Sequence, residues 1–222
     1  MIIGLSGLIG SGKNTAADYL KRSHGFTQLA FADALKDTVG SVFSWPRPLL
    51  EGDTDESRIF RETIDQWWSR RLGIENFTPR YALQHIGTDV FRQHFNDSVW
   101  ILNVERKIAT LQEHGYSVVV TDVRFPNELS ALRQLGAKFL LISPVQKPAW
   151  YDVAKGFPSY NLNQVMRELY PQVHASEYAW VQEQFDAEIV NSGTINELYD
   201  RIEEQLKVWR QVAGGPGQFK GV

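Results

Sequence analysis

The glycine-rich stretch near the amino terminus contains the residue types that bind phosphate. Residues 7–15 read Gly-Leu-Ile-Gly-Ser-Gly-Lys-Asn-Thr and fit the pattern G-x-x-x-x-G-K of a phosphate-binding loop. Glycines let backbone N–H groups turn around an anion, and the N-terminus of a following helix adds partial positive charge. A chance glycine-rich turn is the alternative, but a strand is expected before this stretch and a helix after it. The residues predicted to bind the phosphates of a nucleoside triphosphate are Gly7, Gly10, Ser11, Gly12, Lys13, Asn14 and Thr15.

A second group of charged residues follows the apolar run 118–120. Asp122 comes directly after this predicted strand, where folds that bind nucleoside triphosphates place a carboxylate near Mg²⁺; a turn cap before Pro126 is the alternative. Asn14 stands where Ser or Thr usually holds Mg²⁺, and its carbonyl oxygen could coordinate the ion directly or through water. We therefore predict Asn14 and Asp122 as metal-binding residues, directly or through water, and Arg124 as a phosphate clamp.

A phosphate-binding loop does not define the acceptor of a phosphoryl group, but two further segments contain suitable cations. In one of them, Lys36 lies a helical turn after Asp33, and Asp33 follows a predicted strand. The other has Arg80, Gln84 and, in part, Asp89 and Arg92 at helical intervals, for which a solvated helix face is the alternative. Tryptophans could stack on a base, although most tryptophans are core residues. The residues predicted to bind an acceptor are Asp33, Lys36, Arg80, Gln84, Arg92, Arg124 and Trp150.

Composition limits the class of protein that can present these residues. The 222 residues include 23 Lys and Arg against 26 Asp and Glu, and the net charge of −3 argues against a broad nucleic-acid-binding surface. Cysteine is absent, so thiolate catalysis and disulfides are excluded. No apolar run approaches the length of about 18 residues needed for a membrane span, and the first residues lack the pattern of a signal peptide. We therefore expect a cytoplasmic protein that binds neither membranes nor nucleic acid directly.

The elements that must position the candidate residues alternate along the chain. Buried strands are predicted at 2–6, 27–31, 117–121, 138–142 and 187–190. Helices are predicted at 14–23, 33–43, 97–114, 127–135 and 194–209, with Asp33, Asp97 and Thr194 as caps. A loop is predicted at 44–58, followed by a helical pattern from Phe60 to Leu72. Short buried strands alternating with helices indicate an open α/β fold with a parallel sheet, in which ligands bind beyond the carboxyl ends of the strands.

Several short motifs together resemble one enzyme family. They are the loop 7–15, Phe-Ala-Asp-x-Leu-Lys at 31–36, Pro-Arg-x-x-Leu-Gln-x-x-Gly-Thr-Asp at 79–89, Thr-Asp-Val-Arg-Phe-Pro-Asn-Glu at 121–128, and His-x-Ser-Glu at 174–177. In this order they resemble the phage-type deoxynucleoside monophosphate kinase family, in which an Asn after the loop lysine is familiar. Similarity to phosphomevalonate and dephospho-coenzyme A kinases is looser.

The resemblance implies a P-loop kinase fold, a three-layer sandwich around a parallel sheet, with an acceptor-binding insertion and a mobile lid. It places a single domain at 1–212, with the core at 1–43, 98–144 and 181–212, the insertion at about 44–97, the lid at about 145–180 and a flexible tail at 213–222. Dimers are common in that family, which leaves both a monomer and a homodimer open.

The resulting hypothesis is transfer of the γ-phosphate of ATP, with Mg²⁺, to a deoxynucleoside 5′-monophosphate for DNA precursor synthesis. Lys13, Asp122, Arg124 and Arg92 are the predicted catalytic residues; Arg124, with Arg92 or Arg80, would hold the acceptor phosphate. A kinase of another phosphorylated small molecule and a nucleotide-dependent switch are the alternatives. The lack of an Asn-Lys-x-Asp segment and of a basic stripe favours the kinase.

Overall fold

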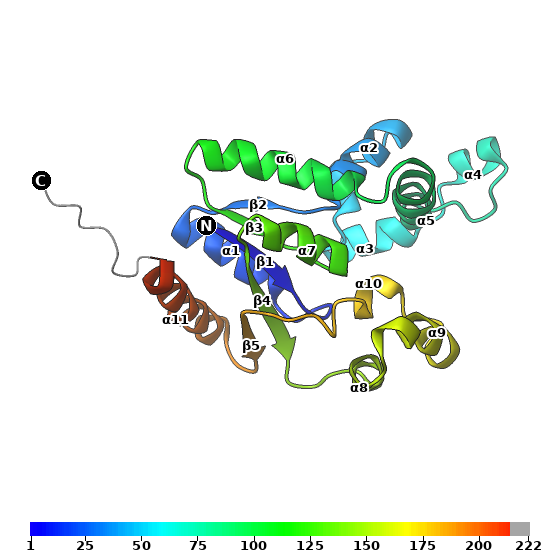
Figure 1. The fold of residues 1–222 in the computed structure, drawn as a ribbon. Coiled ribbons are helices and arrows are strands. Elements are labelled where there is room, and N and C mark those ends of the chain that lie inside the picture. Colours follow the sequence, from blue (N-terminus) through cyan, green and yellow to red (C-terminus); the bar gives the residue numbers. More distant parts are fainter. Residues whose placement is uncertain (214–222) are drawn as a thin grey trace, which may run out of the picture. The chain divides into compact units, whose positions relative to one another are not determined.

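The chain forms two compact units in the computed structural model, which describes residues 1–213 (Figure 1). The first unit contains Met1–Gln28 and the chain from Gly115 onward, and the second contains Leu29–His114. The predicted insertion at 44–97 lies inside the second unit. The predicted tail begins at Ala213, which is the last residue of a helix; the rest of that tail lies outside the described residues.

The first unit is built on a sheet of five strands. In chain order these are β1 (Ile2–Ser6), β2 (Thr27–Leu29), β3 (Val118–Val120), β4 (Lys138–Pro144) and β5 (Ala187–Asn191). Their order in the sheet is β2-β3-β1-β4-β5, and the pairs β1–β3, β1–β4 and β4–β5 are parallel. The predicted strands and the parallel sheet are confirmed, although β2 ends at Leu29 rather than at Phe31. The central position of β1 places the glycine-rich loop beside the ends of both neighbouring strands.

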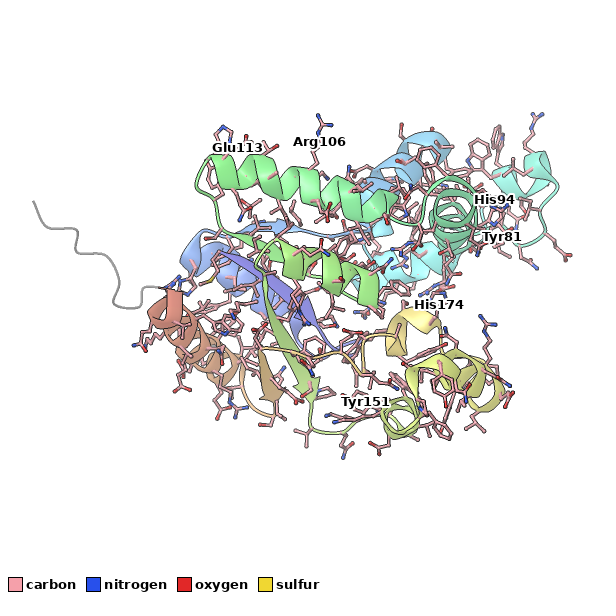
Figure 2. All side chains as sticks on the ribbon, in the orientation of Figure 1. Tyr81, His94, Arg106, Glu113, Tyr151 and His174 are labelled. Carbon is pink, nitrogen blue, oxygen red and sulfur yellow. The ribbon has the colours of Figure 1, made fainter. Side chains whose placement is uncertain are left out.

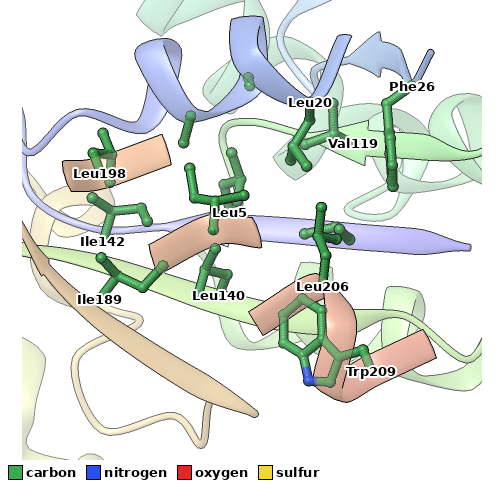
Figure 3. Close-up of a cluster of buried hydrophobic side chains, with 14 residues drawn as sticks. Leu5, Leu20, Phe26, Val119, Leu140, Ile142, Ile189, Leu198, Leu206 and Trp209 are labelled. Atoms are coloured by element: carbon green, nitrogen blue, oxygen red, sulfur yellow. The ribbon is translucent and has the colours of Figure 1, made fainter. Parts of the chain in front are cut away.

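One face of this sheet is covered by α1 (Lys13–His24) and α11 (Ile195–Ala213). Apolar side chains of the strands pack there against both helices and form one buried cluster (Figure 3). Leu198, Ile202, Leu206 and Trp209 recur every three or four residues and are all buried, as their spacing predicts. The same spacing would place Ile195 in this stripe, but its side chain is 60% exposed because it is the first residue of the helix, before the turn that reaches the sheet.

The other face of the sheet is covered by α7 (Pro126–Gln134). Phe139 points to this face, since Leu140 and Ile142 point to α1 and α11, and the guanidinium of Arg133 lies 5.0 Å from the centre of the Phe139 ring. Helix, sheet and helix thus form the three layers expected of the fold. Three short helices fill the segment after β4: α8 (Ala149–Gly156), α9 (Ser159–Leu169) and α10 (Ala175–Tyr178).

The second unit consists of helices and their connections, apart from Leu29 at the end of β2. These are α2 (Asp33–Phe43), a 3-10 helix η1 (Arg47–Leu50), α3 (Asp55–Glu62), α4 (Gln66–Leu72), α5 (Pro79–Gln84), a π-helix η2 (His85–Phe95) and α6 (Val99–Glu113). Their core is rich in aromatic residues: Phe43 stacks on Trp45 with ring centres 4.6 Å apart, and Phe77 packs against both rings.

Two predictions in the second unit are wrong because a side chain stops or starts a helix. The expected loop 44–58 contains η1 and the start of α3, whose N-cap Thr54 exchanges hydrogen bonds with Ser57. The helical pattern from Phe60 to Leu72 is not one helix. Asp65 interrupts it, because its carboxylate accepts hydrogen bonds from the backbone N–H groups of Trp67 and Trp68, both at 3.1 Å, and so begins α4.

The two aspartates predicted as helix caps are each displaced from the cap position. Asp33 is the first residue of α2 rather than its N-cap, although its carboxylate still accepts from the backbone N–H of Ala30 at 2.8 Å. Helix α6 begins at Val99, so Ser98 is the N-cap and Asp97 precedes it. Within residues 1–213, none of the helices combines the length and the apolar character that a membrane crossing requires.

Candidate active site

The glycine-rich loop connects β1 to α1 in a conformation that requires glycine at two positions. Gly7 has φ +145°, and a Cβ there would lie 2.1 Å from the carbonyl oxygen of Ile142 in β4. Gly12 has φ +105°, and a Cβ there would lie 2.6 Å from Nδ2 of Asn191. Both values of φ lie in the region that L side chains rarely adopt. The loop backbone therefore packs directly against residues at the ends of β4 and β5, where a side chain at Gly7 or Gly12 would not fit.

The inner side of this loop has an unused hydrogen-bonding group. Ser11 is 2% exposed, and its hydroxyl oxygen is buried without a hydrogen-bond partner among the described residues. The first turn of α1 contains no acidic residue, so the backbone N–H groups at the helix N-terminus are not neutralised by a carboxylate. An orphaned hydroxyl beside a helix N-terminus fits a phosphate group.

Lys13, the first residue of α1, folds back over the loop. Its Nζ donates to the carbonyl oxygens of Gly7 and Leu8 at 2.6 and 2.7 Å. Burial lowers the pKa of Lys13 from 10.5 to about 8, and the positive charge of Arg124 acts in the same direction. The negative charges of Glu177 and Asp122 oppose that shift. The positive charge of Lys13 is thus only partly compensated by neighbouring negative charges, and an anion bound in the loop would complete the compensation.

Arg124 is held at its backbone by strand β1 and helix α7. The hydroxyl of Ser6 donates to the carbonyl oxygen of Val123 at 2.6 Å. The buried carboxylate of Glu128 accepts from the backbone N–H groups of Arg124 and Phe125 at 2.9 and 3.1 Å. The segment that follows β3 therefore has a fixed path, with Asp122 half-buried beside Val123.

The side chain of Arg124 reaches helix α10, whose N-cap residue His174 is labelled in Figure 2. Nη1 of Arg124 donates to a carboxylate oxygen of Glu177 at 2.8 Å and to the hydroxyl of Ser176 at 3.4 Å. The effect of Arg124 on the pKa of Lys13 indicates that the two cations lie close enough to interact. Lys13, at the end of the glycine-rich loop, and Arg124 therefore lie near each other within the first unit.

The candidate metal ligands form a sparse set. Among the residues that the structure describes, no three His, Cys, Asp or Glu side chains are grouped to hold a metal ion. Asn14 is exposed at the second position of α1, and Asp122 is half-buried after β3. Mg²⁺ usually retains several waters and binds through one or two protein oxygens together with substrate phosphates. This donor set therefore fits Mg²⁺ in the company of a nucleotide.

The second unit arranges Asp33 and Lys36 in a network of ion pairs at α2. Lys36 Nζ donates to Glu51 at 2.6 Å, and Arg47 contacts Glu51 as well. Arg47 also reaches Asp33 at 3.2 Å and Asp37 at 2.6 Å. The network lowers the pKa of Glu51, whose burial acts in the opposite direction but is outweighed by the hydrogen bonds and charges of Lys36 and Arg47. Two predicted acceptor residues are thus held in place by their neighbours.

The π-helix η2 contacts α2 through a glycine. A Cβ on Gly87 would lie 2.5 Å from Cδ2 of Leu35, and the indole N–H of Trp100 donates to the carbonyl oxygen of Gly87 at 3.1 Å. In a π-helix the hydrogen bonds span five residues, so the α-helical spacing assumed for Arg80, Gln84 and Arg92 does not continue beyond α5. The prediction that these residues follow α-helical intervals is therefore wrong for Arg92.

The predicted acceptor residues differ in how available they are. Arg80 pairs with Glu62 on the exposed surface, and Gln84 is exposed at the end of α5. Arg92 is half-buried in η2. Trp150 is half-buried in α8, with its ring centre 6.1 Å from that of Tyr151. Contact of these four residues with an acceptor stays a prediction.

Three supporting residues are not among the site residues predicted above. Glu177 belongs to a motif noted above, but its partner Arg124 is 53 residues away. The amide of Asn191, at the end of β5, donates to the carbonyl oxygen of Ser11 at 3.0 Å and so holds the phosphate loop. Arg47 follows Pro46 in a segment expected to be loop. Only Asn191 carried a usable signal, because it directly follows a buried strand.

Comparison with known proteins identifies the family. The chain is 30% identical over 213 residues to an Acanthamoeba polyphaga mimivirus protein named "Putative deoxynucleotide monophosphate kinase", covering 91% of this chain and 94% of that protein. The chain belongs to the deoxynucleotide monophosphate kinase family. The family's sequence profile, described as "Deoxynucleotide monophosphate kinase", matches residues 46–152 of this chain.

Other similarities are shorter or more distant. The deoxynucleoside-5′-monophosphate kinase of Escherichia phage T5 is 34% identical over 85 residues, covering 37% of this chain and 33% of that protein. The solved dephospho-CoA kinase from Campylobacter jejuni covers 93% of this family member at 13% identity, and 96% of its own chain is covered, with a TM-score of 0.45. At that TM-score the similarity carries no conclusion about function.

Proposed function

We propose that this protein transfers the γ-phosphate of ATP to the 5′-phosphate of a deoxynucleoside monophosphate, which gives ADP and a deoxynucleoside diphosphate. The observation that carries the proposal is the pair of cations, Lys13 and Arg124, beside a glycine cradle that contains the orphaned Ser11 hydroxyl. Two phosphate groups must be brought together in this reaction, and two cations in one site neutralise their repulsion.

The donor side of the site is the glycine-rich loop. Backbone N–H groups at the start of α1 and the Ser11 hydroxyl hold the phosphate chain of ATP. Lys13 exchanges the carbonyl oxygens of Gly7 and Leu8 for phosphate oxygens, since a charged acceptor makes a stronger hydrogen bond than a neutral one. Asn14 and Asp122 hold Mg²⁺ directly or through water. When bound, the ion supplies charge neutralisation at the transferred phosphate.

The acceptor side requires cations that leave the attacking oxygen in line with the γ-phosphorus. Arg124 holds the acceptor phosphate in that position. An oxygen of the acceptor phosphate attacks the γ-phosphorus as the bond to the bridging oxygen of ADP breaks. The protein forms no covalent intermediate, and its contribution is positioning and charge neutralisation. The segment 145–180 acts as a lid that keeps water from the γ-phosphate.

The test is ADP release from ATP and Mg²⁺ with each of the four deoxynucleoside monophosphates, and with phosphomevalonate and dephospho-coenzyme A. We expect turnover that depends on a deoxynucleotide and is reduced by orders of magnitude in Lys13→Ala. The matched control is Lys21→Ala, an exposed lysine in the last turn of the same helix, which leaves turnover near the wild-type level. Transfer only to the two non-nucleotide acceptors, or slow hydrolysis that no acceptor stimulates, contradicts the proposal.

A further inference from the structure

The guanidinium of Arg124 is gripped at one end only. Its hydrogen bonds to Glu177 and Ser176 both come from Nη1, and no hydrogen bond or ion pair of Nε or Nη2 is found among the described residues. Nε and Nη2 together form the edge of a guanidinium that binds two oxygens of one phosphate side by side. The Arg124 side chain remains 35% exposed, whereas that of Glu177 is 19% exposed. The carboxylate is therefore the more buried support, and the guanidinium is the accessible partner.

We propose that Glu177 is a positioning residue that holds Arg124 through Nη1, so that the Nε–Nη2 edge is presented to a substrate phosphate. This inference rests on the proposed function for the identity of that phosphate, and on the geometry of Arg124 for the rest. A long arginine side chain has many rotamers, and fixing it before the substrate arrives removes that entropic cost from binding.

The surroundings of the pair are built to keep it in place. The Arg124 backbone is fixed by the buried Glu128, as described above. Glu177 lies in the first turn of α10, where the Nδ1 of His174 accepts from the backbone N–H of Ser176 at 3.2 Å (Figure 2). Glu177 also partly offsets, at Lys13, the positive charge of Arg124. One carboxylate thus orients one cation and reduces its repulsion with the other.

Two variants separate orientation from folding. Glu177→Gln keeps the size of the side chain and an oxygen that accepts from Nη1, and Glu177→Ala removes both. We expect Glu177→Ala to lower kcat/KM for a deoxynucleoside monophosphate about 10- to 100-fold, as misplacement of a substrate-binding group does, and Glu177→Gln to lower it less. The matched control is Glu204→Gln on α11, an exposed glutamate outside the segments assigned to the site, with wild-type kinetics.

A double-mutant cycle shows whether Glu177 acts through Arg124. In an Arg124→Ala background, adding Glu177→Ala should change kcat/KM by less than about twofold, because the group that Glu177 positions is gone. If the two losses multiply instead, Glu177 acts independently of Arg124 and the inference is wrong. If Glu177→Gln unfolds at nearly the same temperature as the wild type, a folding defect is excluded as the cause of its lower kcat/KM.

A second readout does not depend on kinase activity. In the wild type, nuclear magnetic resonance should detect the Arg124 guanidinium as a restrained group whose signals shift when inorganic tripolyphosphate is added. In Glu177→Ala that restraint should be lost, whereas in Glu204→Gln it should persist. If the wild type phosphorylates no deoxynucleotide, the proposed function fails while this measurement still decides the role of Glu177. An Arg124 signal that is equally restrained in wild type and Glu177→Ala overturns the inference.

Discussion

The lowered pKa of Lys13 predicts that nucleotide binding depends steeply on pH in the alkaline range. Burial disfavours the ammonium form, so Lys13 loses its proton at about pH 8 instead of 10.5 in the free protein. A polyphosphate stabilises the ammonium form, so only protein with protonated Lys13 binds it well. The affinity is therefore high below the pKa of the free protein and falls as the pH rises through it.

The size of the effect follows from the fraction of Lys13 that is protonated. With a pKa of about 8, this fraction falls from about 90% to about 10% between about pH 7 and about pH 9. The dissociation constant for ATP should therefore rise about tenfold over that interval. A lysine with the ordinary pKa would leave the constant almost unchanged over the same interval.

The assay is equilibrium binding of ATP in the presence of a chelator, so that no metal ion contributes to the pH dependence. Lys13→Met removes the titrating group and should bind weakly with a nearly flat profile, whereas Lys21→Met should keep the wild-type profile. Direct measurement of the Lys13 side-chain signal in the free protein gives the pKa independently. A Lys13 that titrates near 10.5, or a wild-type affinity that is constant up to about pH 9, refutes the argument from burial.

Three further substitutions test other parts of the molecule. Gly12→Ala introduces a Cβ 2.6 Å from Nδ2 of Asn191 at φ +105°, and should lower the free energy of unfolding by about 1–3 kcal/mol in urea titrations while abolishing most ADP release. Arg124→Ala should raise the KM for the acceptor or lower kcat while ATP still binds in calorimetry; loss of ATP affinity would assign Arg124 to the donor side. Leu206→Ala empties a position that is 1% exposed and should cost about 2–5 kcal/mol in urea titrations, with kcat of the folded protein unchanged.

The sheet and its flanking helices could be predicted because their signals are local. Each strand is a short apolar run, and the stripe from Leu198 to Trp209 records which side of α11 is buried. The errors arose where a single side chain competes with the pattern around it. Asp65 divides an apparently continuous helix because its carboxylate caps a new one. The π-helix had no local signal, since Gly87 contacts Leu35 and Trp100, which come from other helices.

In the candidate site too, residues that are close in the sequence could be predicted, whereas contacts between distant residues could not. The glycine-rich loop is contiguous, so its residues could be proposed as phosphate-binding from spacing alone. The supports of the site are not contiguous: Glu177 is 53 residues from Arg124, and Asn191 is 180 residues from Ser11. A sequence can indicate that Arg124 follows a strand, but only the fold brings a carboxylate to its Nη1.

The hydrogen-bond partners of each cation in the free protein predict whether that cation changes partners when a ligand binds. Lys13 is held by two neutral carbonyl oxygens, which a phosphate replaces with a stronger acceptor. Arg124 and Lys36 are held by carboxylates, at 2.8 and 2.6 Å, and releasing those would leave a buried or half-buried charge unpaired. Lys13 should therefore exchange its partners on binding, while Arg124 and Lys36 keep theirs and use their remaining donors. Under the proposed function, the first unit thus combines one mobile cation, Lys13, for the transferred phosphate with one fixed cation, Arg124, for the acceptor.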